Sequence, residues 1–235
     1  MSAQQLNLAL SLPDDALFDN FLVTPGSARL QVIEELKRCS DKLHFTSTLV
    51  WGACGSGLTH LLQATCHEAL RKGQSIQYLA LDELIDFPAR EILQGLNSCQ
   101  LVCIDNIHKV VGEPAWEEAL FHLFNAVMDA QGQLVMSSEA APRNLAFQLA
   151  DLKSRLTAST VFQLPDYSDD EKAEIVQYRA NIIGLHFSNE ALSFLMNRAP
   201  RDLHSLLKHL HRLDSYTLQY QSKPTIPLMK KAFGW

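Results

Sequence analysis

The sequence predicts an α/β protein, in which a domain built on a parallel five-stranded sheet is followed by a small all-helical domain. Three observations predict it. A short apolar run at 48–51 leads into a glycine-rich turn at 52–57 and then into apolar residues at helical spacing. A second apolar run, 101–104, ends in Asp105, which is typical of a buried strand in a parallel sheet. After Pro165 the chain carries helical periodicity alone.

Composition limits the class of protein. The chain has 235 residues, of which 47% are hydrophobic and 20% charged, as in ordinary globular proteins. No apolar run is long enough to cross a bilayer and no signal peptide is recognised, so we expect a cytoplasmic protein without a membrane part. The net charge is −6 and no basic block stands out. We therefore expect contact with DNA to be weak or indirect.

The first element is an alternation of leucines with small or polar residues. Gln5, Leu6, Leu8 and Leu10 carry it, and Pro13 ends it. Alternation predicts either an edge strand or an extended tail whose leucines fill pockets on another protein. Both interpretations stay open from the pattern alone.

The remaining elements follow from periodicity and from helix-start and helix-end signals. Ser27 is the expected N-cap of a helix at 28–38, and Gly73 ends the helix after the glycine turn. We expect further strands at 75–81, 101–105, 134–138 and 161–164, a helix or loop at 83–96, and a helix at 116–130. Beyond Pro165 we expect helices at 169–183, 189–198, 201–220 and 226–233, the first opened by a capping box at 168–171. The predicted domains are a tail at 1–13, the sheet domain at 14–165 and the helical domain at 166–235.

The glycine turn matches the phosphate-loop pattern G-x-x-x-x-G-K-[ST] at every defining position except the lysine. Gly52 and Gly57 hold the glycine positions, Thr59 the hydroxyl position, and Leu58 stands where the lysine belongs. Amides of such a loop and the following helix N-terminus bind anions, whereas the alternative is a glycine turn without a ligand. The predicted nucleotide-binding residues of this stretch are Gly52, Cys54, Gly55, Ser56, Gly57, Leu58, Thr59 and His60.

Asp105 supplies the second part of a nucleotide site. An aspartate at the end of a buried strand orders magnesium in such sites, so Thr59 and Asp105 are the expected Mg²⁺ residues, acting through the nucleotide. The next position often carries the acid that orients the attacking water, but here it is Asn106. With neither the lysine nor that acid, we expect a nucleotide-binding protein that hydrolyses triphosphate poorly and is not an enzyme in its own right.

Six stretches give the chain a family resemblance over nearly its whole length. They are FDNF at 18–21, GLTHLL at 57–62, LVCIDNI at 101–107, SS at 137–138, LKSRL at 152–156 and PRDL at 200–203. In this order and spacing they resemble the DnaA/Hda family of AAA+ proteins, whose fold is a P-loop sheet domain followed by a helical lid.

The resemblance implies further site residues. Phe21 would line the adenine side of the pocket, and Ser138 would sit at a polar sensor position. Arg201 would be a second sensor that opens a lid helix, and Arg155 would be an arginine finger that acts in trans. Without the resemblance, Arg155 and Arg201 would be interpreted as surface arginines.

The chain looks most like the shorter regulatory members of that family. The resemblance implies a protein that holds ADP, with or without Mg²⁺, and docks on the DNA polymerase III sliding clamp through Gln5, Leu6, Leu8 and Leu10. Such a protein stimulates hydrolysis of ATP bound to DnaA and so prevents re-initiation of chromosome replication. The resemblance favours the tail over the edge strand, while homo-oligomerisation stays open.

Two other functions compete with this one. A self-sufficient AAA+ ATPase, such as a remodeller or loader, is disfavoured by Leu58 and Asn106, which remove charge where hydrolysis needs it. A DnaA-like initiator that binds origin DNA is disfavoured by the acidic balance and by the lack of a recognisable DNA-binding domain.

Overall fold

The computed structural model describes residues 12–13, 16–23, 26–39, 41 and 44–235. The chain divides into two compact units, residues 1–165 and 166–235, which are described separately. None of the helices in the described parts of the chain is long and apolar enough to cross a membrane.

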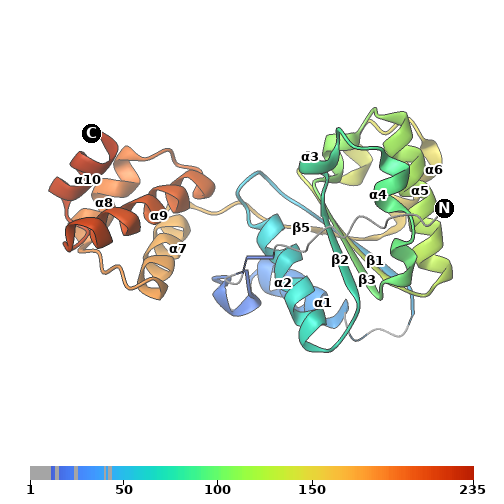
Figure 1. Ribbon diagram of the computed structural model, residues 1–235, viewed down its shortest axis with the longest axis horizontal. Helices are drawn as coiled ribbons and strands as arrows, with labels where there is room; N and C mark the ends of the chain where they lie inside the picture. Colours follow the sequence, from blue (N-terminus) through green and yellow to red (C-terminus); the bar gives the residue numbers. More distant parts are fainter. Residues whose placement is uncertain (1–11, 14–15, 24–25, 40, 42–43) are drawn as a thin grey trace, which may run out of the picture. The chain divides into compact units, whose positions relative to one another are not determined.

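The first unit is built on a parallel sheet of five strands (Figure 1). The strands are β1 (Thr46–Trp51), β2 (Ile76–Ala80), β3 (Leu101–Asp105), β4 (Gln133–Ser138) and β5 (Thr160–Gln163), in the spatial order β2-β3-β4-β1-β5. β1, which leads into the glycine turn, lies between β4 and β5. Trp51 pairs with Ser138 and with Gln163, so three strands end together at the start of that turn.

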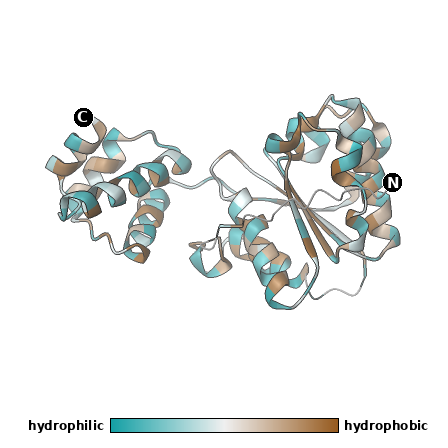
Figure 2. Cartoon of the chain, viewed as in Figure 1, coloured by the Kyte–Doolittle hydropathy of each residue, from teal (hydrophilic) through white to brown (hydrophobic). Residues whose placement is uncertain are grey.

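Side chains alternate between the two faces of the sheet, as the pleat requires. Leu49 belongs to the hydrophobic core on one face, whereas its neighbour Val50 belongs to the core on the other. β3 and β4 are buried along their whole length because both faces are covered. The strands appear as a predominantly hydrophobic layer inside the first unit (Figure 2).

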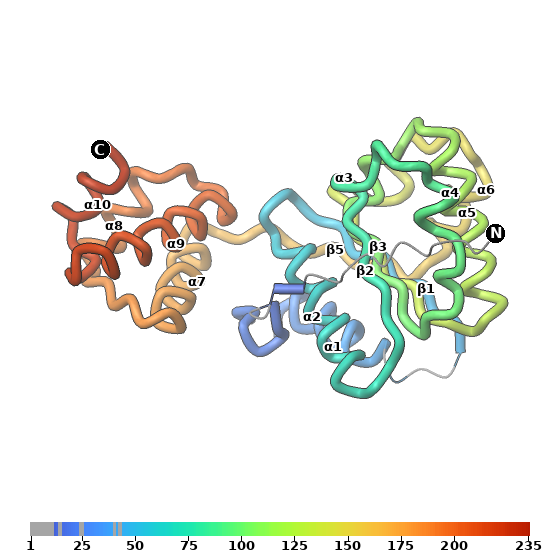
Figure 3. The backbone as a smooth tube through the Cα atoms, in the orientation of Figure 1, coloured from blue at the N-terminus to red at the C-terminus, as the bar shows by residue number. Residues whose placement is uncertain are grey.

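Helices cover each face of the sheet. On one face lie α1 (Ala28–Cys39) and α2 (Leu58–Arg71), and on the other lie α4 (Ala89–Leu93), α5 (Pro114–Asp129) and α6 (Ala150–Ala158) (Figure 1). The short α3 (Leu81–Leu84) and the 3₁₀ turns η1 (Phe18–Asn20), η2 (Leu96–Ser98), η3 (Ile107–Val110) and η4 (Pro142–Asn144) complete the described part of the unit. The backbone trace shows β2 and β3 running side by side before the chain turns into α5 (Figure 3).

The structure differs from the sequence-based expectation at two places in this unit. The stretch left open as helix or loop contains α3, α4 and η2, separated by breaks. A helix before the fifth strand, α6, was not expected at all. It is only nine residues long and buries just Leu152 and Leu156, so its periodic signal is short.

The second unit contains four helices, as predicted. They are α7 (Asp169–Ile182), α8 (Asn189–Arg198), α9 (Leu203–Tyr220) and α10 (Ile226–Phe233). The expected capping box is present, because the Ser168 hydroxyl accepts from the Glu171 amide and the Glu171 carboxylate accepts from the Ser168 amide. Ala180, Leu185 and Leu210 form a small buried cluster of this unit.

Candidate functional site

The glycine turn joins the end of β1 to α2 in a conformation that needs its glycines. Gly55 and Gly57 have φ angles of 82° and 100°, in the left-handed region that side chains disfavour. At Gly52 a Cβ atom would lie 2.6 Å from the Leu164 carbonyl oxygen, so the turn has no room for a side chain there. The Gly52 amide donates to the Ser138 carbonyl at 3.1 Å, which ties the turn to the end of β4.

Ser56 gives this turn the character of a ligand site. Its side chain is fully buried, and its Oγ has no hydrogen-bond partner among the described residues. An unpaired buried hydroxyl costs free energy unless a ligand or water satisfies it. The hydroxyl and the α2 N-terminus therefore fit a bound phosphate group, and Cys54 and Thr59 are exposed at the same turn.

Phe21 and His60 lie together beside the turn. A Cβ atom on Gly57 would meet the Phe21 ring at 2.6 Å, so the ring packs directly against the backbone of the turn. The Phe21 and His60 rings are 5.4 Å apart between centroids. His60 Nε2 lies 2.8 Å from the Leu17 carbonyl oxygen and donates to it, because a carbonyl can only accept. The two rings thus form an aromatic wall next to the phosphate turn.

Leu58, at the lysine position, faces the protein interior. Its side chain is 7% exposed and belongs to the core between α2 and the sheet, with Leu61 and Leu62. Only the backbone of Leu58 can therefore contribute to an anion site at the turn. The structure gives a physical account of the missing lysine: the side chain fills core volume.

Asp105 is held by hydroxyl groups from both neighbouring strands. It is 1% exposed, the Tyr78 hydroxyl donates to Oδ2 at 2.8 Å, and the Ser137 hydroxyl donates to Oδ1. Burial, and secondarily the negative charge of Asp105, raise the pKa of the Tyr78 phenol above its ordinary value. A carboxylate has about four acceptor positions, so Asp105 keeps capacity for a magnesium-bound water. Among the described residues, no group of three or more His, Cys, Asp or Glu side chains could hold a metal alone.

Asn106 is fixed in place of the usual second acid. It adopts φ 62°, its backbone amide donates to Ser137 Oγ at 2.9 Å, and its side-chain amide donates to Asp82 at 3.1 Å. The next titratable group, His108, has its pKa lowered by burial, against the opposing effect of the Glu139 carboxylate 3.4 Å away. The Glu139 backbone amide donates to His108 Nδ1 at 3.3 Å. Asn106 has no carboxylate to accept a proton, and the lowered pKa makes His108 a weaker base than an ordinary histidine.

Ser138 ends β4 next to the glycine turn. It is fully buried, its carbonyl accepts from Gly52, and its Oγ accepts from the Ala140 amide at 3.3 Å. The structure therefore brings the predicted residues Phe21, Gly52–His60, Asp105 and Ser138 to the carboxyl edge of the sheet. Tyr78 and Ser137 were missed as site residues because their contacts with Asp105 cross strands that are distant in sequence. The available signal was Tyr78 itself, a side chain with a hydroxyl in the mostly apolar strand β2.

Arg155 lies in the last turns of α6, packed on α5. Its guanidinium carbon is 5.6 Å from the centroid of the Phe121 ring and 5.5 Å from that of Phe124. Nη1 donates to the Met128 sulfur at 3.6 Å, and the side chain is partly buried. Such a stacked guanidinium is stabilised by the ring faces and is held in a defined position.

Arg155 and the glycine turn belong to opposite edges of the sheet. Ser159, whose amide donates to the Arg155 carbonyl, directly precedes β5, and its hydroxyl lies 2.6 Å from that of Ser47 near the start of β1. The glycine turn follows the last residue of β1, which has six residues. At about 3.3 Å per residue, roughly 15–20 Å of sheet separate the two.

Arg201 was expected to open a lid helix, but α9 begins two residues later. Asp202 is the N-cap, accepting from the Ser205 amide at 2.8 Å, and this bond is the main cause that lowers the pKa of Asp202. Arg201 precedes this cap and is exposed, and its guanidinium pairs with Asp169 at 2.8 Å. Within the second unit its partner is thus the first turn of α7. The predicted partner-binding residues Gln5, Leu6, Leu8 and Leu10 lie outside the described residues.

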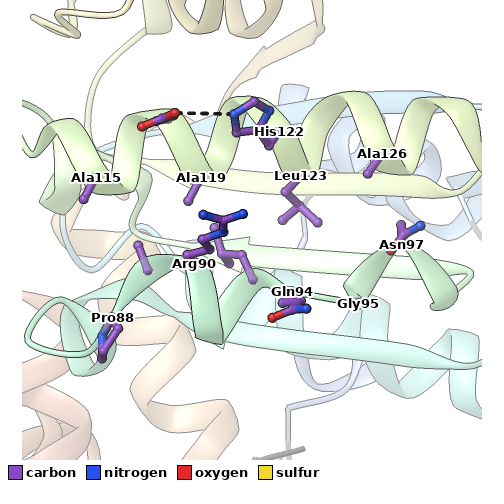
Figure 4. A pocket seen from close by; sticks show the side chains of 13 residues that line it. Pro88, Arg90, Gln94, Gly95, Asn97, Ala115, Ala119, His122, Leu123 and Ala126 are labelled. Carbon is purple, nitrogen blue, oxygen red and sulfur yellow. Dashed lines mark ion pairs between the residues drawn. The ribbon is translucent and has the colours of Figure 1, made fainter. Parts of the chain in front are cut away.

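A groove of about 660 Å³ opens between α4 and α5 (Figure 4). Arg90, Gln94 and Leu93 line it from the α4 side, and Ala119 and His122 from α5. Glu118 pairs with His122 at 3.6 Å along its rim. None of the described site residues predicted from the sequence lines this groove.

Two family models match the chain, one for each unit. The model of the bacterial DnaA ATPase domain matches residues 12–163, and the model of the Hda lid domain matches residues 169–233. An uncharacterized protein of Haemophilus influenzae is 36% identical over 230 residues, which cover 97% of both chains.

Solved structures show the same fold. Domain III of DnaA from Thermotoga maritima aligns with a TM-score of 0.78 at 22% identity, covering 95% of this chain and 97% of that one. AMPPCP-bound DnaA from Aquifex aeolicus aligns with a TM-score of 0.70 at 21% identity, covering 86% of this chain and 65% of that one. The sheet order, the glycine turn and both family models lead to one conclusion: the chain belongs to the DnaA-related family of AAA+ proteins and carries an Hda-type lid domain.

Proposed function

We propose that this protein is a non-enzymatic regulator of DNA replication. It holds ADP at the glycine turn and docks on the DNA polymerase sliding clamp through residues 5–10. It then presents Arg155 to ATP bound by DnaA, and the resulting hydrolysis prevents re-initiation of chromosome replication. Its place in the DnaA-related family supports the general role in replication.

The separation of Arg155 from the chain's own glycine turn carries this proposal. A guanidinium that lies across about 15–20 Å of sheet has no access to the phosphates bound at its own turn. It is nevertheless preorganised by the rings of Phe121 and Phe124 on α5. An arginine that is positioned but remote from its own site is suited to stabilise charge developing on a partner's γ-phosphate.

ADP is favoured over ATP by what the turn retains and what it lacks. The unpaired Ser56 hydroxyl and the α2 N-terminus support binding of a diphosphate. The lysine that normally reaches the β- and γ-phosphates is replaced by Leu58, whose side chain is in the core. The Phe21–His60 wall would hold the base by stacking, and Thr59 and Asp105 would hold Mg²⁺ through the phosphates and water.

The test uses DnaA loaded with labelled ATP, the sliding clamp on DNA, and the full chain. The wild type should speed ATP hydrolysis by DnaA. Arginine fingers typically raise the hydrolysis rate about 10³–10⁵-fold, so Arg155→Ala should lose most of this stimulation. Arg155→Lys should rescue little, because an ammonium does not reproduce the bidentate fork.

Two variants separate a direct role from a structural one. Arg155→Met keeps an unbranched apolar stem over the Phe121 and Phe124 rings, so it should preserve the melting temperature and still lose stimulation. Arg71→Ala, a control at an exposed arginine on α2, should change neither. Normal stimulation by Arg155→Met would overturn the proposal, and rapid steady turnover by the isolated chain would favour a self-sufficient ATPase instead.

A further inference from the structure

We propose that the lid binds single-stranded DNA on a patch of alternating rings and cations formed by α8, α9 and α10. We define the ring–cation patch by six residues: Phe194, Arg212, Tyr216, Tyr220, Lys230 and Lys231. Its assignment to DNA, rather than to another single-stranded polymer, rests on the proposed function in replication.

The patch begins as a stripe along α9. Arg212, Tyr216 and Tyr220 follow one another at four-residue spacing, which sets them on one face of the helix. The Tyr216 and Tyr220 rings are nearly parallel, at 25°, with centroids 5.9 Å apart. Tyr220 keeps 43% of its surface exposed, so this end of the stripe is open to solvent.

Cations accompany these rings. Lys231 Nζ lies 4.0 Å from the Tyr220 centroid, and the Arg212 guanidinium carbon lies 5.9 Å from that of Tyr216. On the α8 side, Lys230 Nζ lies 5.9 Å from the Phe194 centroid. These cation–ring contacts keep the Lys and Arg side chains, and so their positive charge, close to the ring faces.

Acidic residues are segregated from the patch. Residues 189–235 contain seven Lys and Arg but only three Asp and Glu. Glu190 and Asp202 stand at the N-terminal ends of α8 and α9, and Asp214 projects from another face of α9 than Tyr216 and Tyr220, at 100° per residue. The patch therefore offers local positive charge in a chain whose net charge is −6.

Rings and cations in this arrangement match the chemistry of an unpaired nucleic-acid strand. Bases stack on aromatic rings while phosphates pair with nearby Lys and Arg. A duplex has its base faces buried and would use the charges alone, and an acidic peptide would likewise leave the rings unused. The stripe from residue 212 to 220 is about 12 Å long, which would accommodate roughly three or four stacked nucleotides.

The test measures fluorescence anisotropy of a labelled dT15 oligonucleotide with the full chain, from 50 to 200 mM salt, without DnaA or clamp. Tyr220→Ala should weaken binding about 5- to 150-fold, as loss of one stacked base predicts. Leu218→Ala, a control at an exposed residue on another face of α9, should change nothing. Tyr220→Leu keeps apolar bulk and should behave like the alanine variant, with melting temperatures checked for each.

The charge component has its own readout. Lys231→Gln should flatten the dependence of log affinity on log salt by about 0.7, the value for one lost phosphate contact on a single strand. Arg71→Gln, at an exposed arginine of α2 in the first unit, should leave that slope unchanged.

Several results would overturn the proposal. They are absence of dT15 binding, unchanged affinity in Tyr220→Ala, equal affinity for a 15-base-pair duplex, tighter binding of rU15, and equal competition by polyglutamate. Because the assay contains no DnaA, normal stimulation of DnaA by Arg155→Met together with intact dT15 binding would remove the proposed function and leave the lid as a strand-binding surface.

Discussion

At the scale of single residues, the hydroxyl groups around Asp105 set the properties of the carboxyl edge. A carboxylate that is 1% exposed is stable only when donors replace its lost water, and Tyr78 and Ser137 are those donors. The sequence identified Asp105 from its position at the end of an apolar run. It left out the two hydroxyl partners, because a pairing across strands depends on sheet order, which local patterns do not contain.

Removing one donor should be measurable in stability. Tyr78→Phe leaves an oxygen of buried Asp105 without its partner, so the free energy of unfolding at pH 8 should fall by about 1–3 kcal/mol. Tyr220→Phe, at an exposed phenol, is the matched control and should stay within about 0.5 kcal/mol of the wild type. Urea denaturation gives both values, and equal stability of the two variants would contradict the assigned hydrogen bond.

The same substitution should change the pH dependence of stability. In the unfolded chain Tyr78 titrates near pH 10, whereas burial beside Asp105 raises its pKa in the folded chain. The stabilising contribution of the Tyr78 phenol to the free energy of unfolding is fully present below about pH 10. Above about pH 10 this contribution falls by up to about 1.4 kcal/mol per pH unit, because only the unfolded state releases the proton. The stability gap between wild type and Tyr78→Phe should therefore shrink from pH 9.5 to 11, and a constant gap would refute this account.

Leu58 permits a test of why the phosphate turn lacks its lysine. Leu58→Lys removes the leucine side chain from the core, because the lysine ammonium must reach solvent or the turn, so the nucleotide-free protein should lose about 1.5–3 kcal/mol of stability. Calorimetry should show wild-type protein without preference for ATP over ADP, and the variant with stronger ATP binding but slow turnover, since Asn106 remains. Leu58→Met keeps the packed volume and should resemble the wild type. Strong ATP preference with rapid turnover in the wild type would exclude the ADP-holding role.

At the scale of elements, local sequence signals predicted most of the structure. The apolar runs, the glycines and the capping signals predicted all five strands and most helices, because each of these signals is local. The prediction was incomplete where a short element rests on few buried residues, as in α6, whose Leu152 and Leu156 give one periodic pair. The same limit applied to α3 and α4.

Within the glycine turn and α2, Gly57 is the position that should be most sensitive to substitution. Gly57→Ala would add a Cβ atom 2.6 Å from the Phe21 ring at a φ of 100°, so it should displace the ring and abolish ADP binding in calorimetry. Gly73→Ala is the matched control, since its φ is 75° and its Cβ would meet nothing within 4 Å. The control should lose about 1 kcal/mol of stability from backbone strain and keep ADP binding. Equal ADP affinity in both variants would show that Phe21 does not shape the site.

At the scale of the whole molecule, the sequence predicted the fold class and the family correctly, because the motifs follow one another in family order. The roles of Arg155, Arg201 and the tail stay predictions, since they concern partners and ligands. Gln5, Leu6, Leu8 and Leu10 lie outside the described residues, so only binding experiments address them.

The proposed role of the tail can be tested by substitution. Changing Gln5 and Leu6 to alanine together should abolish binding to the sliding clamp in surface plasmon resonance, because each leucine in an apolar pocket contributes on the order of 1.5–3 kcal/mol before ordering costs. The melting temperature should stay unchanged. Changing Ser2 and Ala3 to glycine is a control upstream of the motif. A large drop in melting temperature would identify the segment as a core strand instead.

The width of the sheet between Arg155 and the glycine turn also has a genetic meaning. Residues that are well over 10 Å apart and share no partner contribute independently, so the effects of lesions at the two edges should add. A chain defective at the turn and a chain defective at Arg155 would then define two separable alleles, one losing its resident ligand and the other losing its action on a neighbour. In one fold, ligand binding at the turn and activation of a neighbour by Arg155 would then be traits that selection can change one at a time.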